Sequence, residues 1–206
     1  MSHYFKYDDG YLVLRKKIED NSLWPLLVLI AGMSCSGKSF LAKKLAEEFG
    51  PVSQIPQDKF FRNLDDPAIL KDGNGGLVFD TPEAYHMAEY KLAVSTLSWG
   101  KEIWLPEYSV SENRRIKEKG QKIEPHPIII AEGLFTIQAL RAACQNVISV
   151  FINTDLMVCA NRRAKRDAET LGLPKSVVME VFATKVIPYY QKYAKLQMRS
   201  ADIVLI

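Results

Sequence analysis

The sequence predicts a three-layer α/β fold built on a mostly parallel, five-stranded sheet. Three observations lead to this prediction. Short apolar runs alternate with amphipathic, helix-like segments along most of the chain. A glycine-rich loop at residues 32–39 joins the first apolar run to a helical segment. The chain ends in a further apolar run at residues 202–206, which supplies the last expected strand.

Composition limits the class of protein. The 206 residues are 48% apolar and 25% charged, with a net charge of +3. These values are typical of one compact domain, exclude wholesale disorder and do not favour a nucleic-acid-binding protein. Cys35, Cys144 and Cys159 form no CxxC pair, which indicates a reducing compartment, and we expect a cytoplasmic protein. We find no signal peptide and no membrane-spanning run, so no membrane partner is expected.

The first predicted strand is residues 26–31, LLVLIA, a continuous apolar run that ends at Gly32. A run of this length bounded by glycine is typical of a buried parallel strand. A helix should begin at Lys38, because apolar residues then recur every four positions as far as Phe49. Residues 1–24 are polar and show no clear period. We expect them to form an extension packed on a single domain of residues 25–206.

The remaining elements follow the same alternation. Further strands are expected at residues 52–56, 103–105, 128–131, 147–152 and 202–206. A helix capped by Thr81 should follow the glycine-rich loop at residues 72–76. A charged helix is expected from Asp155 to Leu171. A longer helix should begin near Lys175, and Pro188 should kink or break it.

Residues 32–39 fit the pattern GxxxxGK[ST] and stand between a predicted strand and a predicted helix, which is the context that this phosphate-binding loop requires. Backbone N–H groups of such a loop surround phosphates, and the helix N-terminus adds positive charge. Lys38 would reach the β- and γ-phosphates, and the Ser39 hydroxyl would reach Mg²⁺. We therefore expect ATP or GTP with Mg²⁺. The expected binding residues are Gly32, Ser34, Cys35, Ser36, Gly37, Lys38, Ser39 and Phe40.

Three acidic residues follow predicted strands or begin a predicted helix. Asp58 comes just after residues 52–56, where a carboxylate can accept a proton from an attacking hydroxyl; its ordinary role would be that of a surface loop residue. Asp80 lies at a helix start, where a capping role is favoured over hydrogen bonding to sugar hydroxyls. Glu132 ends the apolar run at residues 128–131, a position from which it can reach Mg²⁺.

Basic and aromatic residues supply further candidates. Helical spacing places Arg162 and Arg166 on one face, with Arg163 beside them. A solvated basic face is the usual reading, but after a phosphate-binding loop such a helix can act as a lid over phosphates, here at about residues 160–175. In the segment 106–115, predicted to be a loop, Tyr108 can line a sugar or base pocket and Arg115 can reach an anion.

Taken together and in order, these segments resemble the uridine kinase and phosphoribulokinase family of P-loop kinases, from about residue 27 to the C-terminus. The segment from Asp58 to Phe61 is similar to the family's Asp-x-[Phe/Tyr]-[Phe/Tyr] motif, whose Asp is the catalytic base. Asp80 lies in a segment similar to Phe-Asp-His-Pro-Asp-Ala, whose Asp binds ribose hydroxyls. Glu132 matches the Glu-Gly that follows the family's buried strand, and Arg162 begins a match to its lid.

The resemblance extends to residues 106–115, but the sequence differs from the family at several positions in and around this segment. Pro106-x-Tyr108 and Arg115 are similar to the family's Pro-x-Tyr-Asp-Phe-x-x-His-x-Arg segment. Asn113 stands where the family has its base-contacting His, and Phe61 stands where the second aromatic is often Tyr. Residues 170–173 read Thr-Leu-Gly-Leu where arginines are expected in the lid.

The resemblance implies an ATP-dependent kinase that phosphorylates the 5′-hydroxyl of a nucleoside. Uridine and cytidine are the acceptors that it favours. It implies catalytic roles for Asp58, Lys38, Arg163 and Arg166. Two alternatives stay open: a kinase of another small alcohol, of the nicotinamide riboside or pantothenate type, and a non-catalytic ATP-binding regulatory module. The expected partner is a small molecule, not a nucleic acid, and homo-oligomer formation is left open.

Overall fold

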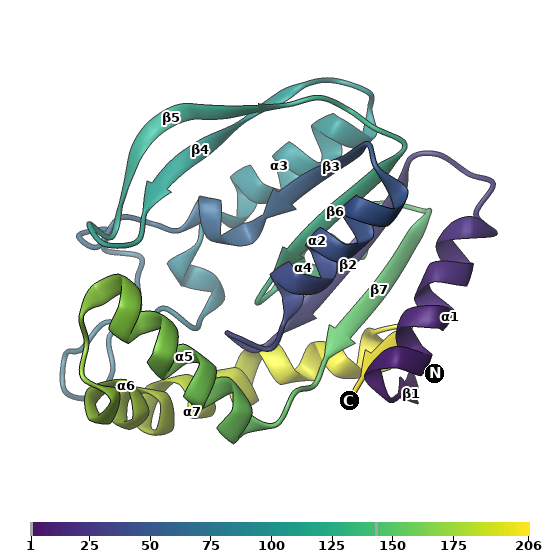
Figure 1. Ribbon diagram of the computed structural model, residues 1–206. Coiled ribbons are helices and arrows are strands. Elements are labelled where there is room, and N and C mark those ends of the chain that lie inside the picture. The colour runs from purple at the N-terminus through teal and green to yellow at the C-terminus, as the bar shows by residue number, and fades with distance from the viewer. Residues whose placement is uncertain (1, 143) are drawn as a thin grey trace.

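The computed structural model describes residues 2–142 and 144–206. Within these residues, six strands form one sheet in the order β1-β8-β7-β2-β6-β3, and every pairing in it is parallel. The strands are β1 (His3–Phe5), β2 (Leu26–Gly32), β3 (Val52–Pro56), β6 (Ile128–Gly133), β7 (Val147–Ile152) and β8 (Ile203–Leu205). Figure 1 shows this sheet running through the middle of the molecule.

The prediction of an α/β fold with a parallel sheet is confirmed, but the sheet has one strand more than the five expected. The additional strand is β1, which pairs with β8 through Tyr4 opposite Val204. It has three residues, none of them buried, at the edge of the sheet. A strand this short has no continuous apolar run, so the sequence pattern gave no signal for it.

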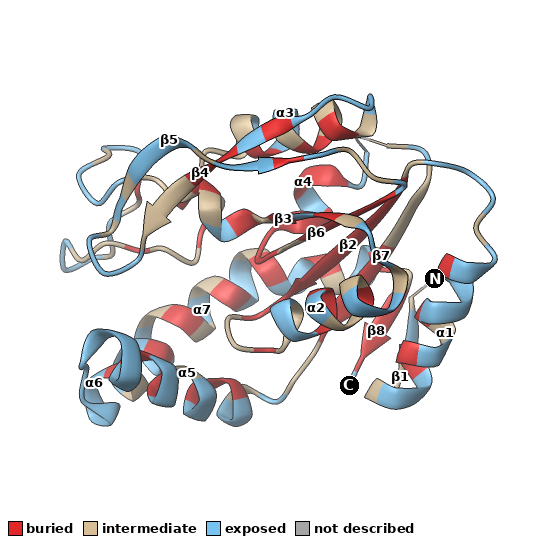
Figure 2. Ribbon diagram, turned by 45° about the horizontal axis from the view of Figure 1, so that its top comes forward, coloured by how far each residue is buried: buried red, intermediate tan, exposed pale blue. Residues whose placement is uncertain are grey.

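Helices cover both faces of the sheet, which makes three layers. Alternate side chains of β2 point to opposite faces: Leu26, Val28 and Ile30 belong to one core, and Leu27, Leu29 and Ala31 to the other. The first core also contains residues of α1 (Tyr7–Glu19) and α2 (Lys38–Phe49), and the second contains residues of α3 (Met87–Ser98) and α4 (Thr136–Leu140). Figure 2 shows the buried strands between helices whose outer faces are exposed.

The C-terminal third is mostly helical. α5 (Leu156–Leu171) begins as predicted at Asp155, whose side chain accepts hydrogen bonds from two backbone N–H groups of the first turn. α6 (Lys175–Val181) follows. The expected kink or break at Pro188 takes the form of a change in pitch, because the chain stays helical from residue 175 to 200 but leaves the regular α-helix on both sides of the proline. Wide π turns at residues 182–186 and 190–194 flank the short α7 (Ile187–Tyr189), in which proline follows the first residue.

Two local expectations need correction. Residues 103–105 do not join the central sheet but begin β4 (Ile103–Ser109), which pairs with β5 (Arg114–Ile123) in a separate antiparallel hairpin. The segment 106–115 is therefore mostly strand, and only its turn is a loop. Thr81 does precede a helical turn, the 3-10 turn Pro82–Ala84, but its hydroxyl makes no capping hydrogen bond. None of the described helices is long and apolar enough to cross a membrane.

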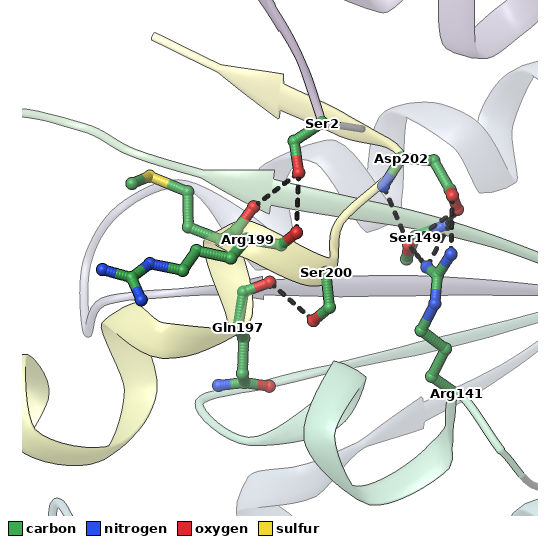
Figure 3. Close-up of polar contacts among 8 residues, drawn as sticks. Ser2, Arg141, Ser149, Gln197, Arg199, Ser200 and Asp202 are labelled. Atoms are coloured by element: carbon green, nitrogen blue, oxygen red, sulfur yellow. Dashed lines mark hydrogen bonds and ion pairs between the residues drawn. The ribbon is translucent and has the colours of Figure 1, made fainter.

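A polar cluster fixes the edge of the sheet where the two termini meet (Figure 3). The Asp202 carboxylate accepts hydrogen bonds from the Ser149 backbone N–H at 2.8 Å and from Arg141 Nη2 at 2.8 Å. Burial opposes ionisation of Asp202, but these hydrogen bonds outweigh it and hold its pKa below the usual value. Ser2 donates to the carbonyls of Met198 and Arg199. These contacts hold β8 and β1 in place beside β7.

Candidate active site

The phosphate-binding loop lies between the end of β2 and the start of α2, as predicted. Its backbone takes left-handed conformations at Cys35 (φ 62°) and at Gly37 (φ 108°), the residue that caps α2. Glycine is required at position 32, where a Cβ atom would lie 2.6 Å from the Ile152 carbonyl oxygen. A curled backbone at a helix N-terminus is the arrangement that binds phosphate groups.

Two residues at the start of α2 point to the phosphate and metal chemistry expected of this loop. Lys38 Nζ donates to the Met33 carbonyl oxygen at 2.9 Å, so the ammonium group lies over the loop itself. Ser39 Oγ donates to Glu132 Oε1 at 2.9 Å. This contact brings together two oxygen atoms that can bind a metal ion, one from Ser39 of α2 and one from Glu132 of β6. Mg²⁺ commonly takes one or two protein oxygens and completes its shell with phosphates and water, so the pair fits that ion.

Asp58 and Asp80 lie in the same cavity as the loop. Asp58 is exposed in the 3-10 turn Gln57–Phe60, just beyond the carboxyl end of β3. Asp80 is not a helix cap. Its side chain is only 13% exposed, and Oδ1 lies 3.9 Å from Arg163 Nη1 of α5. The two carboxylates are close enough for the charge on Asp58 to affect the ionisation of Asp80.

Two carboxylates of the site, Asp80 and Glu132, are buried deeply enough for burial to oppose their ionisation. Burial raises the pKa of Asp80, Arg163 acts against this shift and the Asp58 charge adds to it. Burial also raises the pKa of Glu132, with Lys38 opposing and Asp58 again adding. A cavity whose carboxylates resist ionisation gains from a bound cation or hydrogen-bond donor.

We expect Asp80→Asn to raise the melting temperature. A raised pKa in the folded state means that the ionised form is held less easily than in the unfolded chain. The fold therefore loses stability as pH rises from the pKa of Asp80 in the unfolded chain through its raised pKa in the folded protein. Asn has the same shape without the charge. For a chain of this size each kcal/mol gained corresponds to about 2–4 °C, which differential scanning calorimetry at pH 7 can measure.

Asp66→Asn is the matched comparison, because the pKa of Asp66 is shifted the other way. The Ala68 N–H and the Arg62 guanidinium hold that pKa below its usual value. Its contribution to stability is present at neutral pH and is lost as pH falls through the folded-state pKa. Asp66→Asn should therefore lower the melting temperature at pH 7. A lower melting temperature for Asp80→Asn would contradict our account of the buried carboxylate.

Three arginines of α5 line the cavity beside the loop. Arg162 Nη1 lies 3.4 Å from the carbonyl oxygen of Cys35 in the phosphate-binding loop. Arg163 and Arg166 both pair with Asp167, at 3.4 and 2.8 Å, and Asp167 is only 5% exposed. Asp167 is a buried carboxylate that holds two arginines in position beside the cavity.

An aromatic wall forms the far end of the cavity. Phe61 stacks on Tyr85 with ring centroids 4.2 Å apart and lies 5.6 Å from the Tyr108 ring. The Tyr108 hydroxyl donates to the Arg62 carbonyl at 3.2 Å, which fixes the ring's direction. Asn113, in the turn between β4 and β5, also lines the cavity and has a left-handed backbone (φ 49°). Phe61, Tyr108 and Asn113, three of the residues that the sequence offers as candidates for binding the acceptor, therefore line one cavity.

Arg115 does not reach the cavity, contrary to the sequence-based expectation. Its side chain is 10% exposed, and its guanidinium pairs with Glu89 at 2.7 Å and with Glu118 at 2.8 Å. Position 115 falls in β5 rather than in a loop, and the strand directs this side chain to α3 and along the hairpin. Arg115 therefore has a structural role in joining the hairpin to α3.

The cavity has a volume of about 1330 Å³. Sites for one small ligand usually measure about 300–1,000 Å³, so this space suits two ligands side by side. Of the predicted binding residues of the loop, Gly32 shapes the backbone, and the others line the cavity: Ser34, Cys35, Ser36, Gly37, Lys38, Ser39 and Phe40. Lining residues that sequence reasoning did not select are Tyr7, Phe79, Tyr85, Val110, Ser111, Leu134, residues 152–155, Asp167, Thr170, Leu171, Leu205 and Ile206.

Comparison with known proteins identifies the family of the chain. A model of the phosphoribulokinase / uridine kinase family matches residues 27–206. The chain belongs to this family. A uridine kinase of Salmonella newport is 30% identical over 192 residues, which cover 90% of this chain and 89% of that protein. A uridine kinase of Escherichia fergusonii is 30% identical with the same coverage. The protein is thus a P-loop kinase, a phosphotransferase.

A solved structure supports the fold. A structure described as a possible uridine kinase from Bacillus stearothermophilus superposes with a TM-score of 0.63 at 16% identity, covering 97% of this chain and 98% of that one. At this identity the similarity shows that the three-layer P-loop kinase fold is shared.

Proposed function

We propose that this phosphoribulokinase / uridine kinase family member transfers the γ-phosphoryl group of ATP to the 5′-hydroxyl of a nucleoside, with uridine and cytidine as its acceptors. The observation that carries the proposal is that Asp58 and Asp80 share one large cavity with the phosphate-binding loop. The family match and the relatives named uridine kinase support it.

The donor would bind along the loop. Its phosphates would accept hydrogen bonds from the backbone N–H groups of residues 34–39, and Lys38 would exchange the Met33 carbonyl for the β- and γ-phosphates. Ser39 and Glu132 would hold Mg²⁺. When bound, the ion neutralises charge that develops on the phosphoryl oxygens. Arg163 and Arg166, held by Asp167, would stabilise the remaining charge.

The acceptor would bind between the loop and the aromatic wall. Asp58 would orient the 5′-hydroxyl and accept its proton as the oxygen attacks. Asp80 would accept hydrogen bonds from the vicinal ribose hydroxyls, whose binding offsets the cost of its buried charge. Phe61 and Tyr108 present aromatic surface against which a base can pack, and Asn113 offers an amide at the same end.

A second acceptor class has one specific observation in its favour. The hairpin turn places Val110, Ser111 and Asn113 in the cavity, and none of these side chains is charged. Asn113 stands at the position of the family's base-contacting His, so a different hydrogen-bonding pattern faces the acceptor. This arrangement favours a kinase of another small alcohol, of the nicotinamide riboside or pantothenate type, with the same catalytic residues.

ADP release with ATP and Mg²⁺ tests the proposal across a panel of acceptors. The panel contains uridine, cytidine, adenosine, guanosine, nicotinamide riboside and pantothenate. We expect turnover with uridine and cytidine. Turnover with nicotinamide riboside or pantothenate alone would replace the pyrimidine proposal with the second class. ATP binding with no turnover on any acceptor would favour a non-catalytic, regulatory ATP-binding module.

A further inference from the structure

Tyr7 lines the active-site cavity although it precedes residue 27, where the family match begins. It is the first residue of α1, the helix that follows the unexpected strand β1. Figure 1 shows both termini at one edge of the sheet, with the start of α1 beside the end of β8. The N-terminal extension thus contributes directly to the cavity.

Close packing fixes the position of Tyr7. α1 lies directly on β8 because residue 10 is glycine: a Cβ atom there would meet Leu205 Cδ2. The Ile206 N–H donates to the Phe5 carbonyl at 2.9 Å, so β1 ends beside the end of β8. Lys44 of α2 lies 3.4 Å from the Tyr11 ring centroid and 6.0 Å from that of Tyr7. Contacts with both β8 and α2 therefore hold the start of α1.

The order of the strands indicates whether the donor nucleotide or the acceptor would lie beside Tyr7. The phosphate-binding loop follows β2, in the middle of the sheet. Asp58 follows β3, at one edge, and marks the acceptor side. β7, β8 and β1 lie on the other side of β2, and the cavity is lined there by residues 152–155, Leu205, Ile206 and Tyr7. A triphosphate bound across the loop would place the rest of the donor nucleotide on this second side.

The Tyr7 hydroxyl is a polar group without an evident role in the fold. It is buried, and it has no hydrogen-bond partner among residues 2–142 and 144–206. Burial, with a smaller effect of Asp8, raises the pKa of Tyr7, so the hydroxyl stays protonated and can both donate and accept. A buried hydroxyl left unpaired costs free energy, and such groups usually have a partner in a water molecule or a ligand.

We propose that Tyr7 contacts the nucleoside of the donor nucleotide, with its ring packed against that nucleoside and its hydroxyl hydrogen-bonded to it. The N-terminal extension then completes the donor site at the β8 edge. This proposal rests on the function proposed above, because it takes ATP as the donor. The ligand class is a purine nucleoside triphosphate.

Calorimetric binding of two probes to the full chain tests the proposal. MgATP carries the nucleoside, and magnesium tripolyphosphate carries similar phosphates without it. We expect Tyr7→Ala to raise the Kd for MgATP about five- to 100-fold, as for loss of base–aromatic stacking. We expect Tyr7→Phe to raise it about two- to tenfold, as for loss of one hydrogen bond. Neither variant should change the Kd for tripolyphosphate.

Tyr11→Phe is the matched control, since it removes a hydroxyl one turn further along α1. That hydroxyl contacts Glu48, and Tyr11 does not line the cavity. The control should bind MgATP like the unchanged protein. An unchanged MgATP Kd in both Tyr7 variants, or an equal loss for both probes, would overturn the proposal. Failure of the unchanged protein to bind MgATP would instead overturn the proposed function.

Discussion

Replacing Asp58 by Asn is expected to lower kcat by about 10²–10⁴-fold, the range for loss of a general base. Asp58 is exposed in the cavity, just beyond β3, and Asn cannot accept the proton of the attacking hydroxyl. The shape of the site should be kept, so the KM for ATP should change little. Initial rates of ADP release at saturating uridine measure the effect.

Asp65→Asn is the control for this change. Asp65 is exposed in the segment after Phe61 and does not line the cavity. The Asp65→Asn substitution also removes one carboxylate, and it should leave kcat unchanged. The Asp58→Asn variant should also be at least as stable as the unchanged protein. The charge on Asp58 raises the pKa values of Asp80 and Glu132, and the substitution removes that charge. A kcat within a few-fold of the original would show that Asp58 is not the base.

Replacing Lys38 by Met is the second large effect, with an expected loss of about 10²–10³-fold in kcat/KM, as for one lost charge-stabilising donor. The ammonium group lies over the loop, 2.9 Å from the Met33 carbonyl, where phosphates would take over its hydrogen bonds. Met has a similar length without the charge. Steady-state kinetics with ATP and uridine measure the loss, and the Kd for tripolyphosphate should rise as well.

Lys43→Met serves as the control on the same helix. Lys43 has a side chain that is 77% exposed and pairs with Glu47 at 3.7 Å on the outer face of α2. Its removal should leave kcat/KM and tripolyphosphate binding unchanged, because a surface ion pair of this kind contributes little. Equal losses in the Lys38 and Lys43 variants would indicate a general effect of positive charge and contradict a specific role for Lys38.

The central sheet and the phosphate-binding half of the site could be predicted because their signals are local. Residues 26–31 form an apolar run of strand length, and Gly32–Ser39 is a motif in which nearly every position has a defined role. The positions of Asp58 and Glu132 follow from the rule that the carboxyl ends of parallel strands share one edge. Each of these inferences needs only a few neighbouring residues.

The rest depends on contacts between distant segments. A loop over residues 106–115 would let Arg115 face the site, whereas the hairpin directs its side chain to Glu89, 26 positions earlier. β1 is too short for a pattern, and Tyr7 reaches the cavity only because Gly10 lets α1 lie on β8. Asp80 looked like a cap because no local pattern shows that Arg163 of α5 would lie beside it.

Identification of the phosphorylated product shows which hydroxyl of the acceptor receives the phosphoryl group. The protein would be incubated with ATP, Mg²⁺ and uridine, and in parallel with 5′-deoxyuridine, and the phosphorus spectrum of each mixture recorded. We expect a phosphate monoester on the 5′-carbon of uridine and no nucleoside phosphate from 5′-deoxyuridine. Phosphorylation of 5′-deoxyuridine, or a 2′- or 3′-phosphate from uridine, would contradict the roles assigned to Asp58 and Asp80.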